Sequence, residues 1–160
     1  MATKQKRPPQ LALRLEAEAP DAAARWRDGA SVAYLGAALT LRLDTGCKEA
    51  RLVAGELHLP LPPEATARQV QDAAGSWLRA QALRVISAQV VMAARGMGRP
   101  EPKVSLSFST RGSWAQVVDG GLRFHWRLIE QPQEIIAHVV ERAVAGMPRA
   151  EASPDLFALA

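Results

Sequence analysis

Side chains that could hold a metal ion or act as a nucleophile are scarce in this sequence. Cys47 is the only cysteine among 160 residues, which excludes an internal disulfide and a zinc site built from cysteines. The histidines are His58, His125 and His138. His138 stands four residues before Arg142, a spacing that brings two side chains to one face of a helix. Metal chemistry in this chain would therefore depend on what surrounds these imidazoles.

Other catalytic motifs are absent from the sequence. It contains no Gly-x-Ser-x-Gly, and no motif pairs Cys47 with a base. The Gly-x-Gly at 96–98 follows a predicted helix instead of a strand, so it is not a dinucleotide-binding loop. His58 alternates with Leu57 and Leu59. This pattern places it on the opposite face of a strand from the two leucines, and we expect a surface histidine there.

The composition is typical of one globular domain. With 48% hydrophobic and 22% charged residues, the chain can bury a core. Part of its net charge of +4 comes from Lys4, Lys6 and Arg7, and we expect residues 1–30 to form a weakly ordered basic segment ahead of a domain at 31–160. A lone cysteine and the lack of an apolar run of about 18 residues predict a cytoplasmic protein with no membrane partner.

Two β-hairpins are predicted in the first half of the chain. Apolar and polar residues alternate in four short runs, and glycines fall where the chain must turn, at Gly36 and Gly55. The four runs are SVAYLG (31–36), LTLRLD (39–44), ARLVAG (50–55) and ELHLPL (56–61). Pro62 and Pro63 then end this part of the sheet.

A long helix is the clearest predicted element. Thr66 and Gln69 form a capping box at its start, the helix continues to Arg95, and Gly96 and Gly98 end it. Apolar residues recur at i, i+3, i+4 and i+7, which predicts one buried face with Trp77 as its core anchor. The predicted buried face comprises Val70, Ala73, Ala74, Trp77, Leu78, Ala82, Val85, Ala88 and Met92.

The remaining sequence predicts a strand, a hairpin and a second helix. VSLSFST (104–110) alternates like a strand, and two further strands are predicted near 113–118 and 121–127. Either Asp119-Gly120 or Gly120-Gly121 makes the tight turn between these two strands. A helix begins at Pro132, and its predicted buried stripe is Ile135, Ile136, Val139, Val140 and Val144. The fold class is therefore α+β.

Several short motifs, in a particular order and spacing, carry a family resemblance. They are YLG (34–36), SWLRAQAL (76–83), Trp114, Gly121, HWRLI (125–129), Pro132, Glu134, IIAHVV (135–140) and SPDLF (153–157). Over roughly residues 31–157 the chain resembles the YgjP-like zinc metallopeptidases. The resemblance implies a zincin-like α+β domain with a small antiparallel or mixed sheet, one long helix and a second, former active-site helix.

The resemblance also implies a zinc site whose residues this sequence does not have. In the family, the two histidines of His-Glu-x-x-His on the second helix and a later histidine bind zinc. The glutamate of this motif is the general base. In the same register this chain has Arg142, Ala143, Gly146 and Ala152. A guanidinium has no free lone pair for a metal, and alanine and glycine offer no ligand. We therefore predict no catalytic residues and no zinc cofactor.

A metal site with relocated ligands is one alternative. His138 precedes Arg142 by one turn and His125 lies on a neighbouring predicted strand, while Glu151 and Asp155 flank the third ligand position. Such a cluster would support a metal-dependent hydrolase. The opposing interpretation is that His138 is a packed, hydrogen-bonded residue and that Arg142 repels any cation.

Binding is the leading functional prediction. The former cleft is expected to persist as a groove lined by Trp114, His125, Arg127, His138 and Arg142. A peptide or protein segment could add to an edge strand there. Its arginines would favour acidic residues, unless they pair with glutamates on the surface.

Nucleic-acid binding is a further alternative. It is suggested by the basic N-terminal segment and by helix arginines such as Arg79, Arg84, Arg95 and Arg99. Helix arginines are, however, commonly no more than a solvated face.

Overall fold

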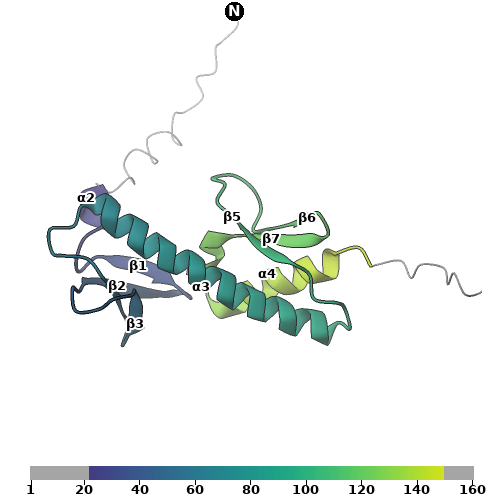
Figure 1. Cartoon of the computed structure of the whole chain (residues 1–160). Helices are drawn as coiled ribbons and strands as arrows, with labels where there is room; N and C mark the ends of the chain where they lie inside the picture. Colours follow the sequence, from purple (N-terminus) through teal and green to yellow (C-terminus); the bar gives the residue numbers. More distant parts are fainter. Residues whose placement is uncertain (1–21, 150–160) are drawn as a thin grey trace, which may run out of the picture. The chain divides into compact units, whose positions relative to one another are not determined.

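The computed structural model describes residues 22–149, and Figure 1 shows its elements. Within this range the chain forms two compact units. The first unit contains residues 22–32 and 38–77, and the second contains 33–37 and 78–149. One sheet lies mostly in the first unit, the other lies in the second unit, and a long helix contributes to both units. The predicted α+β class is confirmed, with two mixed sheets in place of one.

The first sheet contains the strands that the alternating runs predicted. A short helix, α2 (Ala22–Arg25), precedes it. Its strands are β1 (Ser31–Tyr34), β2 (Ala37–Leu43), β3 (Arg51–Val53) and β4 (Glu56–Leu59). Their order is β1-β2-β4-β3, with β2 parallel to β4 and β3 antiparallel to β4. The turn between β3 and β4 has positive φ at Ala54 (48°) and Gly55 (79°), as a two-residue hairpin loop requires.

Leucines from two strands form the core side of this sheet. Leu39 and Leu41 of β2 and Leu57 and Leu59 of β4 are buried. The register places Leu41 opposite Leu57, so the apolar residues of both strands share one face. His58 points to the other face, as its position between two leucines predicted.

Helix α3 (Ala67–Gly96) begins with the predicted capping box. The backbone N–H of Thr66 donates to Gln69 Oε1 at 2.8 Å, and the N–H of Gln69 donates to Thr66 Oγ1 at 3.2 Å. At the other end, Gly98 has a positive φ of 62° and the N–H of Arg99 donates to the carbonyl of Ala94. Both ends are therefore set by local chemistry.

The buried row of α3 differs from the predicted face. Every fourth residue is buried: Val70, Ala74, Leu78, Ala82, Ile86, Val90 and Ala94. Four residues turn a helix by about 400°, so each step shifts the buried row by about 40° and the row winds around the helix. The prediction kept to one face and was wrong in its later members: Met92 is 68% exposed and Ala88 is also exposed. Trp77, expected as a core anchor, is only half-buried.

The second sheet has three strands in the order β5-β7-β6. They are β5 (Val104–Ser107), β6 (Ala115–Val118) and β7 (Gly121–His125), with β5 parallel and β6 antiparallel to β7. Asp119 (φ 50°) and Gly120 (φ 75°) form the turn between β6 and β7, which decides between the two predicted turns. The strand predicted near 121–127 ends at His125, because residues 126–130 form a 3-10 helix, η1 (Trp126–Glu130).

Helix α4 (Gln133–Gly146) completes the second unit and packs against β6. Ile136, Val140 and Val144 form its buried row. Ile135 is exposed, contrary to prediction, because it lies about 100° around the helix from Ile136. The core also contains Leu122, Phe124, Leu128 and Ile129.

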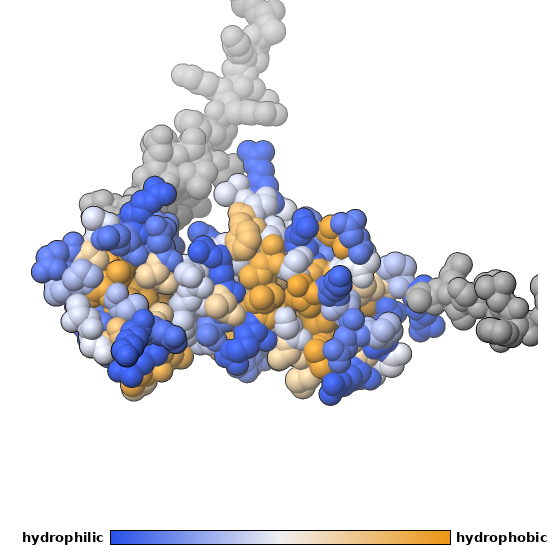
Figure 2. Space-filling model, in the orientation of Figure 1, coloured by the Kyte–Doolittle hydropathy of each residue, from blue (hydrophilic) through white to orange (hydrophobic). Residues whose placement is uncertain are grey.

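Part of the protein surface is apolar. Large apolar side chains also reach the surface of the chain (Figure 2), among them Leu83 and Met92 of α3. In the part of the chain that the structure describes, no helix is long and apolar enough to cross a membrane.

Candidate functional site

Of the residues that the resemblance aligns with the family's zinc motif, two lie on the solvent side of α4. Arg142 and Gly146 are exposed and Ala143 is half-buried. Arg142 lies about 200° around the helix from the middle of the buried row. Within residues 22–149 its guanidinium forms no hydrogen bond or ion pair. Ala152, the fourth position, lies outside the described residues.

The residues at these positions do not fit a zinc ion. Catalytic zinc takes about three nitrogen, sulfur or oxygen ligands from the protein. Arg142, Ala143 and Gly146 provide none, and the charge of Arg142 opposes a dication. Among the described residues no group of three or more His, Cys, Asp or Glu side chains could hold a metal. Glu151 and Asp155, which the relocated site would use, lie outside this range.

His125 uses both of its ring nitrogens in hydrogen bonds. Nε2 lies 2.6 Å from the carbonyl oxygen of Ser109. Because a carbonyl only accepts, Nε2 carries the hydrogen. Nδ1 accepts a hydrogen bond of 3.2 Å from the backbone N–H of Arg127 and thereby caps η1. Both ring nitrogens are therefore occupied, and a metal could bind the ring only by displacing one of these partners.

Only part of the predicted groove is brought together. The rings of Trp114 and His125 meet edge to face with centroids 6.1 Å apart. Arg127 reaches His125 through its backbone, while its guanidinium lies 5.5 Å from the ring centre of Trp126. His138 is exposed on α4. Within the described range neither His138 nor Arg142 forms a hydrogen bond, ion pair or ring contact with the other three.

A small hollow adjoins Trp114 and His125 and was not predicted from the sequence. Its volume is about 180 Å³. It is lined by Ser109, Thr110, Arg111, Gly112, Ser113, Trp114 and His125. The available signal was the polar run STRGS directly after an alternating strand. That signal indicates a loop, but only the fold brings His125 against it.

A larger hollow lies elsewhere in the second unit and contains no predicted site residue. Its volume is about 680 Å³. It is lined by Met97, Gly98, Arg99, Pro100, Glu101, Pro102, Gly120, Met147, Pro148 and Arg149. These residues come from the two helix C-termini and the β6–β7 turn. The hollow is therefore formed by loops and helix ends.

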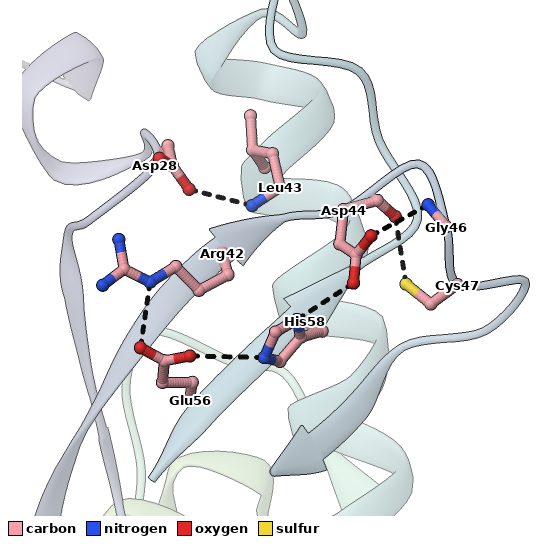
Figure 3. Close-up of polar contacts among 8 residues, drawn as sticks. All are labelled: Asp28, Arg42, Leu43, Asp44, Gly46, Cys47, Glu56 and His58. Atoms are coloured by element: carbon pink, nitrogen blue, oxygen red, sulfur yellow. Dashed lines mark hydrogen bonds and ion pairs between the residues drawn. The ribbon is translucent and has the colours of Figure 1, made fainter. Parts of the chain in front are cut away.

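The first unit contains a network of charged groups around His58 (Figure 3). His58 Nδ1 lies 3.1 Å from Asp44 Oδ2, and His58 Nε2 lies 3.3 Å from Glu56 Oε2. Glu56 Oε1 in turn accepts a 3.0 Å hydrogen bond from Arg42 Nε. His58 lies on the predicted face away from the leucines, but these contacts leave its side chain only 20% exposed.

This network explains the acidity of Asp44. The hydrogen bond from the backbone N–H of Gly46 (2.8 Å) is the largest cause that lowers the pKa of the Asp44 carboxyl, followed by the hydrogen bond with His58. The thiol of Cys47 is buried and donates to the backbone carbonyl of Asp44 at 3.1 Å. These contacts connect β2, the loop after it and β4, and we interpret them as structural.

Comparison with known proteins gives one family match. Residues 8–141 match the model of the YgjP-like, metallopeptidase domain family. The match starts before the expected residue 31 and ends one residue before Arg142. No curated protein and no solved structure matches significantly. Because the matched region covers most of the chain, this protein belongs to the YgjP-like metallopeptidase-domain family.

Proposed function

We propose that this family member does not carry out zinc-dependent hydrolysis and acts instead by binding an extended segment of a peptide or protein. The proposal is supported by the residues that the resemblance aligns with the zinc motif on α4, because Arg142, Ala143 and Gly146 offer no metal ligand. The single cysteine, free and buried, fits the cytoplasmic location that we propose with it.

The outer edge of β6 is the surface that we propose for the segment. Among the strands of residues 22–149, β6 pairs with β7 alone. The N–H of His125 donates to the carbonyl of Trp114, so Trp114 and every second residue after it direct their backbone groups toward β7. The N–H and C=O groups of Ala115 and Val117 must then point away from the sheet. They are the groups that an added strand would pair with.

Two observations support access to this edge. Val117 is 47% exposed, so α4 leaves it open although that helix packs against β6. Ser113 Oγ donates to the carbonyl of Ala115 at 2.8 Å, which leaves the N–H of Ala115 and both groups of Val117 for a ligand. Arg127 and Arg142 are exposed in the same unit and favour acidic segments.

The metal half of the proposal is tested by restoring the motif. Wild-type protein, purified without added metal, is expected to contain no stoichiometric zinc. The variant Arg142→His/Ala143→Glu/Gly146→His/Ala152→His should bind about one zinc per chain. Space for the third change exists, because a Cβ on Gly146 would meet nothing within 4 Å.

The matched control lacks only Ala152→His and should bind zinc much more weakly, since it supplies two imidazoles. Elemental analysis and a peptidase assay are the measurements. Stoichiometric zinc in the wild type, or peptidase activity that a chelator removes, would contradict the proposal. If zinc is lost from the wild type on His138→Ala or His125→Ala, the relocated hydrolase site becomes the better interpretation.

The binding half is tested at Val117. Val117→Pro removes the outward N–H, and proline is tolerated at an edge where that group faces solvent. Binding of extended acidic peptides, followed by amide shifts of labelled protein, should disappear in Val117→Pro and persist in Val117→Ala. Equal binding by both variants would exclude strand addition at β6.

The nucleic-acid alternative makes a different prediction. Its basic residues Lys4, Lys6 and Arg7 lie outside the described range. Salt-dependent binding of DNA that is lost on deleting residues 1–10 would favour it over peptide binding.

A further inference from the structure

We propose that the hollow at 109–114 is a subsite for a carboxylate side chain of the segment bound along β6. This inference rests on the proposed function, which it extends by assigning one residue of the ligand. The hollow adjoins the start of β6, because Ser113 and Trp114, which line it, directly precede Ala115. A ligand strand that pairs with Ala115 and Val117 therefore reaches the rim of the hollow.

The loop that forms the hollow is held in place by its own hydrogen bonds. Ser109 Oγ donates to the carbonyl of Arg111 at 2.5 Å and accepts from the N–H of Arg111 at 3.2 Å. The carbonyl of Ser109 is held by His125 Nε2. Gly112 has a φ of 132°, a conformation that side-chain-bearing residues rarely adopt. The loop is therefore ordered before a ligand binds, which lowers the entropic cost of binding.

The chemistry of the lining favours an anion. Arg111 is exposed, and within residues 22–149 its guanidinium has no hydrogen bond or ion pair. From Lys103 to Val118 the sequence contains no Asp or Glu, so no carboxylate of this segment competes for Arg111. A guanidinium binds a carboxylate through two parallel hydrogen bonds, and the hydroxyl of Thr110 can donate a third.

The size and the walls of the hollow favour a side chain over a larger group. A volume of about 180 Å³ is smaller than the roughly 300–1,000 Å³ of pockets that hold drug-sized ligands, and it accommodates a carboxylate with its methylene groups. Trp114 is 42% exposed and supplies an apolar wall for those methylenes. Glutamate, with its longer stem, fits this combination better than aspartate.

The test is a glutamate scan of one extended peptide. The probes are nine-residue peptides of alternating valine and threonine, each with one glutamate, and a matching set with glutamine. At the position that reaches the hollow, glutamate should bind about tenfold more tightly than glutamine, because charge-assisted hydrogen bonds are stronger than the neutral ones that an amide oxygen accepts. Other positions should show little difference.

Substitutions in the protein test whether Arg111 causes the preference for glutamate. Arg111→Ala should abolish the preference for glutamate at that position while leaving the glutamine peptide bound as in the wild type. Arg84→Ala is the matched control, because Arg84 is an exposed arginine on α3 whose only hydrogen-bond partner within the described residues is Gln81. This variant should keep the preference.

The two proposals fail in different ways. If glutamate and glutamine peptides bind equally at every position, or if Arg111→Ala keeps the preference, the subsite is wrong while strand addition stands. If no peptide binds, or if binding is unaffected by Val117→Pro, the proposed function fails and the subsite fails with it.

Discussion

The guanidinium of Arg99 caps the C-terminus of a helix whose residue Val144 lies 45 positions further along the chain. Arg99 Nη1 donates to the carbonyl of Val144 and to that of Met147, each at 2.8 Å. The last carbonyls of a helix have no partner within it, and a cation near them is stabilising. The loop after α3 is therefore fastened to the end of α4.

Replacing this arginine should destabilise the second unit measurably. Arg99→Ala removes two charge-assisted hydrogen bonds that are partly buried, and we expect a loss of about 1–3 kcal/mol in the free energy of unfolding. Urea denaturation provides the measurement. The control is Arg95→Ala, whose exposed ion pair with Glu101 is 3.4 Å long and should contribute less than about 0.5 kcal/mol. Equal losses in both variants would refute the capping role.

The winding buried row of α3 predicts which of its residues matter for stability. Ile86 is fully buried, and Ile86→Ala should cost about 2–5 kcal/mol through lost burial and a cavity. Met92→Ala should change stability by less than about 0.5 kcal/mol, because Met92 is largely exposed. Thermal unfolding of both variants tests this. A large loss at Met92 with a small loss at Ile86 would support the single-face pattern instead.

The lowered pKa of Asp44 predicts a pH-dependent stability. The folded state favours the ionised carboxylate, through the Gly46 N–H and His58. Its contribution is present above the ordinary carboxyl pKa of about 3.9 and is lost as the pH falls through the lower folded value. Asp44→Asn should therefore lower Tm at pH 7, and the difference from wild type should narrow below about pH 4.

The matching control for Asp44 is an exposed aspartate. Asp72 faces Arg68 at 3.9 Å on the surface of α3, and Asp72→Asn should leave Tm nearly unchanged at pH 7. A Tm difference for Asp44→Asn that widens as the pH falls would have the wrong sign and would contradict this assignment.

Chelation should leave the stability of the protein unchanged. A metal that bound only the folded state would raise Tm, and removing it would lower Tm. Since the residues on α4 do not fit zinc, we expect the same Tm with and without EDTA, measured by thermal scanning. A drop of several degrees on chelation, reversed by zinc, would refute the proposed loss of the metal.

Local patterns in the sequence were sufficient for most secondary structure. Alternation predicted the strands around Gly55, because side chains on a strand point to opposite faces in turn. The capping box at Thr66 predicted where α3 begins, since its two hydrogen bonds join residues three apart. The sequence restricted the turn between β6 and β7 to two choices, Asp119-Gly120 and Gly120-Gly121. All of these features depend on neighbours within a few residues.

The tertiary structure decided which of the apolar residues are buried and what the polar ones contact. Apolar residues lie on several sides of α3, so its sequence permits more than one buried row. Only the elements packed against the helix decide that Ile86 is buried and Met92 is exposed. His125 is bonded to Ser109, 16 residues earlier, and His58 to Asp44, 14 residues earlier. The sequence by itself determined most of the helices and strands and the residue types on α4, because these are local or fixed by residue identity. Burial and hydrogen-bond partners depend on residues far apart in the chain, and only the fold brings those together.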